Sequence, residues 1–319
     1  MNQENQTWCI QKTACEQENF HRKIWPYNNA RTALLWCLRA CNIRQNERVI
    51  LPAYIGWSNR EGSGVFDPIR ELGLQYEFYA VDRHLQIDVD DLAKKLGDGT
   101  RVLVVIHYFG RPDPHLSEIV EMAHRAGIYV IEDAAHALYS AWVGNCCGQF
   151  GDATIFSLHK MLPIVNGGYL QVNNAELTKF LNTAGGYFES NSKYLMVGTE
   201  YDLAAIASVR QENQAFLKEI ITQFSDKIEL LWPDEADQQV IPQTLPIVIN
   251  CRPREDLYFT LNKAGFGAVS LYHTMISEIN QENFPESHWL ARRILNLPVH
   301  QDCTKASLQA MVDCMKGIV

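Results

Sequence analysis

Apolar residues in the middle of the chain follow two different periods. Four short runs are apolar along most of their length, as is typical of buried strands: residues 101–110, 128–134, 152–158 and 168–173. Between the first two, residues 115–127 (HLSEIVEMAHRAG) carry apolar side chains at helical spacing and end at a glycine. Buried strands that alternate with helices predict an α/β fold, in which a mostly parallel sheet is covered on both faces by helices.

The N-terminal segments continue this alternation. Residues 30–41 (ARTALLWCLRAC) have helical spacing, and Asn29 is placed to cap that helix. A short apolar strand ends at Pro52, and a second strand is expected at residues 75–82 (QYEFYAVD). Residues 88–97 (DVDDLAKKLG) predict a helix that ends at its final glycine.

The pattern changes after a long helical segment at residues 201–224. From about residue 228, a shorter set of strands and helices follows, which predicts a smaller α/β unit. We therefore expect three parts: an N-terminal arm without periodicity (residues 1–24), a large domain (residues 25–220) and a small C-terminal domain (residues 221–319).

Composition and charge narrow the class of protein. The 319 residues carry a net charge of −9, with a pI of about 5.6, which speaks against a basic nucleic-acid surface. No apolar run approaches the roughly 20 residues of a membrane span, and the first residues, MNQENQ, do not resemble a secretory signal. Nine cysteines, an odd number without CxxC spacing, are interpreted as reduced thiols. We expect a cytoplasmic protein with neither a nucleic-acid nor a membrane partner, and without a bound metal.

Polar groups stand at strand and helix ends, where open α/β sheets bind their ligands. Asp133 follows one strand, Ser157 ends the next, and Lys160 comes three residues later, ahead of a Gly-Gly pair. A fourth feature is the helix start at residues 29–32, whose free N–H groups can hold a phosphate. Taken singly, Asp133 could be a helix cap, Ser157 a satisfied hydroxyl, and Lys160 a surface residue whose amine reaches solvent.

Together these groups match the needs of pyridoxal 5′-phosphate (PLP). A lysine forms a Schiff base with its aldehyde, and a carboxylate keeps its ring nitrogen protonated, so that the ring accepts electrons. A helix start and a hydroxyl bind its phosphate. Lys160 is thereby explained as a cofactor residue, and the Gly167–Gly168 pair as a tight return of the backbone beside it.

The same segments resemble the DegT/DnrJ/StrS family of PLP-dependent sugar aminotransferases. The resemblance rests on VIHYFGRP, on IEDAAHALYSAWVGNCCGQFGDATIFSLHK and on NGGYLQVNN, and it extends to ARTALLWCL, VILPAYIGWS, VGTEYDLAAIASV and ILNLPVHQDCTKASLQAMV. It covers nearly the whole chain after residue 25. It implies the fold-type-I PLP-dependent transferase fold: a large domain with a mostly parallel sheet flanked by helices, and a smaller C-terminal α/β domain.

The resemblance also implies catalytic roles. Lys160 would form the Schiff base and carry the proton between the substrate Cα and the cofactor, while Asp133 would pair with the pyridine nitrogen. His136 would lie near the ring hydroxyl, although a hydrogen-bonded core histidine is its alternative interpretation. His107 is interpreted as structural rather than catalytic.

Further cofactor contacts follow from the same resemblance. The phosphate would be bound by Ser157 together with the backbone and side chains of Arg31 and Thr32. An aromatic residue of the AYIGW turn, Trp57, would stack on the cofactor ring. Substrate-side candidates share an aromatic or imidazole ring and comprise Tyr187, Phe188, Tyr194, Tyr272 and His273.

The implied activity is transfer of an amino group from an amino acid donor, expected to be glutamate, to a keto substrate, expected to be a nucleotide-linked keto sugar. The implied assembly is a homodimer. Two alternatives stay open: a PLP enzyme of other chemistry (a lyase or non-sugar transaminase), and a non-catalytic homologue that acts as a binding or regulatory subunit. The dehydratase branch of the family lacks the lysine, so Lys160 speaks against that branch.

Three departures from the family pattern bear on these expectations. The family usually has five residues from the strand-end serine to the lysine, whereas Ser157 and Lys160 are three apart. Glu200 and Asp202 occupy places where the family commonly has Asn and Arg near the partner subunit's cofactor phosphate. Little chain lies between Gly168 and Gly198 to build a substrate loop.

Overall fold

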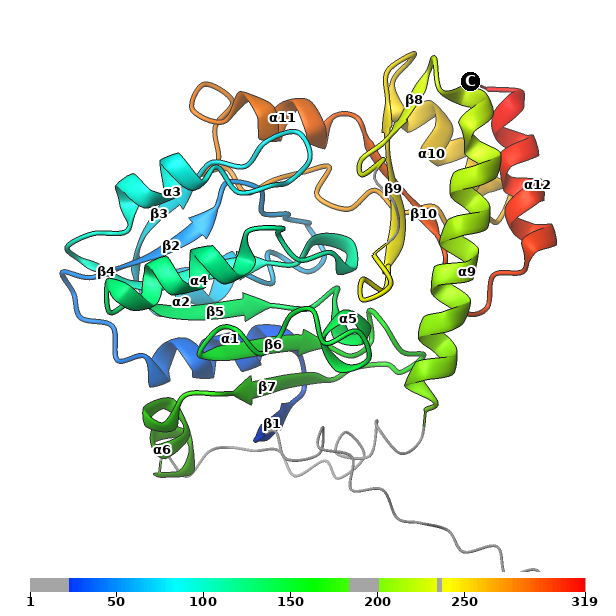
Figure 1. The fold of residues 1–319 in the computed structure, drawn as a ribbon. Helices are drawn as coiled ribbons and strands as arrows, with labels where there is room; N and C mark the ends of the chain where they lie inside the picture. Colours follow the sequence, from blue (N-terminus) through cyan, green and yellow to red (C-terminus); the bar gives the residue numbers. More distant parts are fainter. Residues whose placement is uncertain (1–22, 184–200, 234–236, 319) are drawn as a thin grey trace, which may run out of the picture.

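A seven-stranded sheet forms the centre of the computed structural model, which describes residues 23–183, 201–233 and 237–318 (Figure 1). The strand order is β1-β7-β6-β5-β4-β2-β3. The strands are β1 (Ile24–Tyr27), β2 (Arg48–Pro52), β3 (Gln75–Tyr79), β4 (Thr100–Ile106), β5 (Tyr129–Asp133), β6 (Ala153–Ser157) and β7 (Gly168–Val172). Neighbours from β3 to β6 pair in parallel, whereas β7 is antiparallel to both β6 and β1. The predicted mostly parallel sheet is confirmed.

Helices and one 3-10 turn connect these strands. They are α1 (Ala30–Ala40), α2 (Phe66–Glu71), α3 (Val89–Lys95), η2 (Tyr108–Gly110), α4 (Leu116–Arg125), α5 (Leu138–Trp142) and α6 (Ala175–Thr183). Asn29 caps α1 as predicted, because its Oδ1 accepts a hydrogen bond from the Thr32 N–H at 2.9 Å. The chain leaves α4 through Gly127, whose φ of +72° suits glycine. β5 and β6, at the centre of the sheet, are buried almost throughout, which explains the consecutive apolar residues within each strand.

A second, antiparallel sheet has the order β10-β9-β8. Its strands and the nearby helices are β8 (Ile228–Leu230), β9 (Thr244–Ile249), β10 (Ile294–Pro298), α9 (Leu203–Ile221), η3 (Thr222–Phe224), α10 (Arg254–Lys263), α11 (Pro285–Ala291) and α12 (Lys305–Lys316). Figure 1 shows α9 as a long helix that runs from the level of β7 up to the small sheet, with α12 beside it. Buried apolar side chains from the end of α9, from this sheet and from α12 form a hydrophobic core of their own.

The structure also shows what the sequence patterns did not reveal. β1 begins at Ile24, inside the predicted arm, and the predicted helix at residues 201–224 starts only at Leu203. Some buried residues beyond position 220, among them Ile241 and Ile276, belong to the hydrophobic core of the large sheet. We therefore retain the division into residues 1–24, 25–220 and 221–319 as a proposal.

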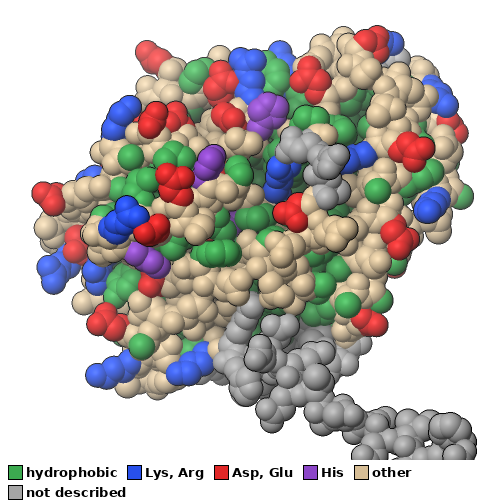
Figure 2. All heavy atoms as spheres, viewed as in Figure 1, with side chains coloured by type: hydrophobic (Ala, Val, Ile, Leu, Met, Phe, Trp, Pro, Cys, Tyr) green, Lys and Arg blue, Asp and Glu red, His purple; other side chains and the backbone are tan. Residues whose placement is uncertain are grey.

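The described surface and helices add two observations. On the face drawn in Figure 2, Lys and Arg side chains are interspersed with Asp and Glu. Of the helices in the described part of the chain, none is long and apolar enough to cross a membrane.

Candidate active site

A cavity of about 740 Å³ opens where β5 and β6 end and α1 begins. This volume is in the usual range for small-molecule and cofactor sites. Six of the seven predicted cofactor residues line the cavity: Arg31, Trp57, Asp133, His136, Ser157 and Lys160. The structure therefore gathers residues that lie up to 129 positions apart in the sequence.

Lys160 stands at the apex of a tight turn. The Leu158 carbonyl accepts hydrogen bonds from the N–H groups of Met161, at 3.0 Å, and Leu162, at 2.8 Å. The side chains of these three residues are buried, whereas Lys160 is exposed toward the cavity. The cavity walls still remove water from its amine, so burial lowers the pKa of Lys160, against the opposing effects of Asp133 and Glu61.

His136 is the neighbour of this amine. Its Nε2 lies 3.1 Å from Lys160 Nζ, and its Nδ1 accepts a hydrogen bond from the Phe109 N–H at 3.4 Å. Since a backbone N–H can only donate, the ring proton belongs on Nε2, facing the amine. Burial, followed by the charge of Lys160, holds the pKa of His136 well below its usual value. A neutral imidazole beside the amine fits the lowered pKa of His136.

Asp133 ends β5 and is 6% exposed. Its Oδ1 accepts a hydrogen bond from the Ala135 N–H at 2.9 Å. It does not cap the next helix, because α5 has Ala137 at its N-cap position and no side-chain cap. Burial raises the pKa of Asp133, and the positive charge of Lys160 opposes this. A buried carboxylate at the cavity wall is thus matched to a protonated nitrogen, such as that of a pyridine ring.

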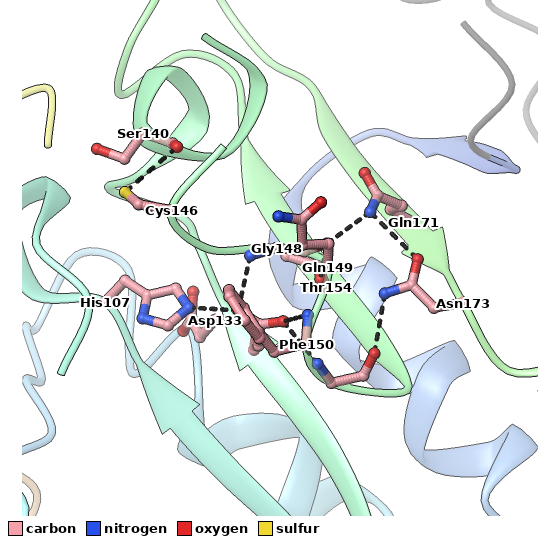
Figure 3. Close-up of polar contacts among 12 residues, drawn as sticks. His107, Asp133, Ser140, Cys146, Gly148, Gln149, Phe150, Thr154, Gln171 and Asn173 are labelled. Atoms are coloured by element: carbon pink, nitrogen blue, oxygen red, sulfur yellow. Dashed lines mark hydrogen bonds and ion pairs between the residues drawn. The ribbon is translucent and has the colours of Figure 1, made fainter. Parts of the chain in front are cut away.

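The preceding residue, Glu132, anchors the loop before β6. Its two oxygens accept hydrogen bonds from the N–H groups of Gly148, Phe150 and Gly151 at 2.6 to 2.9 Å, and Oε2 lies 2.8 Å from His107 Nε2. Burial opposes ionisation of Glu132, but His107 and the backbone donors hold its pKa below the usual value. Figure 3 shows His107, Gly148 and Phe150 close together beside Asp133. His107 therefore has a structural role, and Glu132 was not among the residues singled out from the sequence.

The expected phosphate region lies at the start of α1. Gly168 approaches it so closely that a Cβ there would lie 2.3 Å from the Asn29 carbonyl carbon, which explains the glycine. Gly167 has a φ of +134°, which suits glycine, and its carbonyl accepts a hydrogen bond from the Leu158 N–H at 2.9 Å. Ser157 Oγ faces the cavity and lies 3.3 Å from His159 Nδ1.

Two other phosphate candidates are engaged elsewhere. The Arg31 guanidinium donates to the Glu61 carbonyl and lies 3.6 Å from an Asp67 oxygen. Thr32 is not among the cavity-lining residues, because both its N–H and its Oγ1 face Asn29 Oδ1. Glu61, which the sequence did not single out, also lines the cavity.

The substrate-side candidates divide into two groups. Tyr272 and His273 line the cavity, and the Tyr272 ring contacts those of Tyr54, Tyr108, Phe109 and His136. Tyr272 also has a φ of +59°, a strained backbone conformation of the kind found at ligand sites. Tyr187, Phe188, Tyr194 and Glu200 lie outside the described residues.

Asp202 has a local explanation. Its carboxylate accepts a hydrogen bond from the Ala205 N–H at 2.9 Å and caps α9. No disulfide joins the cysteines that the structure describes, three of which are buried. Within the described residues, no cluster of three or more His, Cys, Asp or Glu is arranged to hold a metal ion.

Comparison with solved structures defines the class of protein. The aminotransferase TlmJ from Streptoalloteichus hindustanus aligns with a TM-score of 0.74 at 21% identity, over 92% of this chain and 85% of that chain. The Helicobacter pylori aminotransferase PseC aligns with a TM-score of 0.74 at 19% identity, over 92% and 86% of the two chains. The fold is that of the fold-type-I PLP-dependent transferases.

Sequence comparison gives the family. The model of the DegT/DnrJ/EryC1/StrS aminotransferase family matches residues 21–207, and the chain belongs to this family of PLP-dependent aminotransferases. The UDP-4-amino-4,6-dideoxy-N-acetyl-beta-L-altrosamine transaminase of Campylobacter jejuni is 25% identical over 92% of this chain and 84% of its own length. The cavity residues fit the cofactor: an amine at Lys160, a buried carboxylate at Asp133, and a helix start for a phosphate.

Proposed function

We propose that the protein transfers an amino group from an amino acid donor, glutamate, to the keto group of a nucleotide-linked sugar, as a cytoplasmic homodimer. The observation that carries the proposal is the placement of Lys160 and the buried Asp133 in one cavity of cofactor size. The sugar substrate is supported by the names of relatives, among them the altrosamine transaminase above and a GDP-perosamine synthase of Escherichia coli.

Each cavity residue has a part in this proposal. Bound PLP supplies an aldehyde that reacts with amines and a ring that accepts electrons from the substrate Cα. Lys160 would hold the cofactor through Nζ and, with the substrate bound, would take the Cα proton on the same atom. Its lowered pKa favours the free amine that this step needs. Neutral His136 orients that amine through the 3.1 Å contact.

The remaining residues bind and orient. Asp133 would accept a hydrogen bond from a protonated pyridine nitrogen, and its burial excludes water that would weaken such a bond. Ser157 and the first N–H groups of α1 bind the phosphate. Trp57 covers one face of the ring. The side chain of Arg31 first has to leave Glu61 and Asp67 in order to reach the phosphate.

The two alternatives make different use of the same cavity. A lyase or a non-sugar transaminase would retain Lys160 and Asp133 and differ on the substrate side, at Tyr272 and His273. A non-catalytic subunit would have no need for a lysine with a lowered pKa beside a neutral histidine. This pairing favours an enzyme.

A half-reaction assay separates these functions. Protein loaded with PLP is mixed with glutamate, and 2-oxoglutarate is measured at one equivalent per site. Nucleotide-linked keto sugars are then added one at a time, and aminated product is detected by mass spectrometry. Formation of 2-oxoglutarate without any sugar product would leave a non-sugar transaminase, and formation of neither would contradict the proposal.

The assembly is tested by light scattering. We expect the mass of two chains, because sites of this fold are completed by a neighbouring subunit according to the family resemblance. A monomer that turned over substrate would contradict the homodimer.

A further inference from the structure

A buried arginine meets the chain directly after Lys160. Arg210 of α9 is 3% exposed. Its Nη2 donates to the Met161 carbonyl and to Gln301 Oε1, both at 3.2 Å, and its Nη1 donates to the carbonyls of Pro242, at 3.2 Å, and Gln243, at 3.1 Å. These acceptors are uncharged, and burial lowers the pKa of Arg210. Burying a cation against neutral acceptors costs free energy, so we ask what the buried Arg210 guanidinium contributes in return.

Tyr139 reinforces the same contact. Its hydroxyl donates to the Met161 carbonyl at 2.9 Å, and the Arg210 guanidinium lies over its ring, 5.1 Å from the centroid. The Met161 N–H in turn donates to the Leu158 carbonyl at 3.0 Å. Both backbone polar groups of the residue next to Lys160 are therefore fixed.

The turn has reason to need this support. Ser157 and Lys160 are only three residues apart, so Lys160 sits on a single tight turn immediately after β6. Its own side chain lines the cavity, where Nζ lies 3.1 Å from His136 Nε2. The direction of the amine then depends on how firmly the turn is held from behind.

We propose that Arg210 is a positioning residue, which with Tyr139 holds the Met161 carbonyl and thereby fixes Lys160 at the cavity. Through its bonds to the Pro242–Gln243 segment and to Gln301, it also ties the lysine turn to the C-terminal third of the chain. The inference rests on the role given to Lys160 in the proposed function.

The test compares Arg210→Met with a matched variant of the same helix. Asn213 is 4% exposed, and its Nδ2 donates to the carbonyls of Val299, His300 and Cys303 at 3.1 to 3.4 Å. Asn213→Ala therefore removes another buried carbonyl clamp of α9, one with no bond to the lysine turn. Both variants should lose stability, and only Arg210→Met should change Lys160.

Two measurements read this out. In the protein without cofactor, the pKa of Lys160 is obtained from the pH dependence of its acylation rate, followed by peptide mass spectrometry. We expect Arg210→Met to move this pKa upward toward that of an ordinary lysine, because a loosened turn lets water reach Nζ. In the loaded enzyme, kcat should fall about 10- to 100-fold, with KM for glutamate changed less than about threefold. Arg210→Lys should recover part of the loss, since it keeps one donor to Met161.

The outcomes separate the two proposals. Equal Lys160 pKa and equal PLP affinity in Arg210→Met, Asn213→Ala and the wild type would overturn the positioning role. A wild type that binds PLP but does not transaminate would contradict the proposed function, while the pKa comparison would still decide the inference. If Arg210→Met does not fold, Tyr139→Phe keeps the ring and the guanidinium, removes one donor to Met161, and should shift the pKa in the same direction by less.

Discussion

Replacement of Asp133 by asparagine removes one negative charge and leaves the size of the side chain almost unchanged. The Oδ1 acceptor of the Ala135 N–H is retained, at 2.9 Å in the wild type. The variant therefore tests the charge of the carboxylate rather than the packing around it. We expect weaker PLP binding together with a protein that folds normally.

The size of the effect follows from the burial of the site. Asp133 is 6% exposed, so a hydrogen bond from a protonated ring nitrogen would form there with little competition from water. A hydrogen bond to a charged group contributes about 1.5–3 kcal/mol, and about 1.4 kcal/mol corresponds to a tenfold change in affinity. The dissociation constant of PLP should rise about 10- to 100-fold.

Asp133→Asn should weaken PLP binding but should not lower the thermal stability of the cofactor-free protein. Burial raises the pKa of Asp133, so its contribution to stability is fully present below the unfolded pKa and is lost as pH rises through the folded pKa. Above that raised pKa the wild type carries a destabilising buried charge, which Asp133→Asn removes. We expect an unchanged or higher melting temperature for the cofactor-free variant at pH 7.

The assay is titration with PLP, followed by absorbance and by thermal melting. Asp113→Asn is the matched control, since burial also raises the pKa of that carboxyl and it does not line the main cavity. The control should bind PLP as the wild type does. Equal PLP affinity in Asp133→Asn and the wild type would refute the pairing of this carboxylate with the ring.

Three further predictions concern the supporting structure. Gly168→Ala should cost about 3 kcal/mol of unfolding free energy, measured by urea denaturation, because the new Cβ would collide with the Asn29 carbonyl carbon at 2.3 Å; an equally stable variant would contradict this close approach. Glu132→Gln should lower the free energy of unfolding by about 3–5 kcal/mol. Because the pKa of Glu132 is lowered in the folded protein, its ionised carboxylate stabilises the fold above the unfolded pKa, and this stabilisation is lost as pH falls through the folded pKa. The difference in unfolding free energy between variant and wild type should therefore shrink at low pH. Asp202→Ala should cost about 1 kcal/mol through loss of the α9 cap with unchanged PLP affinity, whereas a large change in that affinity would show that Asp202 serves the cofactor.

The central sheet was predictable because its strands are buried on both faces. β4, β5 and β6 are buried along most of their length, and each contains consecutive apolar residues, a pattern that is typical of central parallel strands. β1 was not predictable, because its four residues include a proline and, among the described strands, it pairs only with β7. α5 is five residues long, too short for helical periodicity to be recognised.

The residues that line the cavity could be predicted from their side-chain chemistry, whereas the residues that hold them in place could not. Asp133 and Ser157 end neighbouring strands, Lys160 follows three residues later, and the three side chains fit one cofactor. Their convergence could therefore be inferred from the order of strands and side chains along the sequence. Glu132 accepts from backbone N–H groups and Arg210 donates to backbone carbonyls of distant segments, and backbone donors and acceptors leave no mark in a sequence. Glu61 reaches the cavity from a loop whose path depends on tertiary contacts, including its carbonyl bond from Arg31.

The absorption spectrum of the purified protein with PLP, compared with that of Lys160→Ala, tests the central claim most directly. The account predicts a visible band from PLP bound covalently to Lys160, which glutamate bleaches and which the variant lacks. A protein that shows no such band, or a Lys160→Ala variant that retains it, would contradict the assignment of Lys160 as the residue that holds the cofactor.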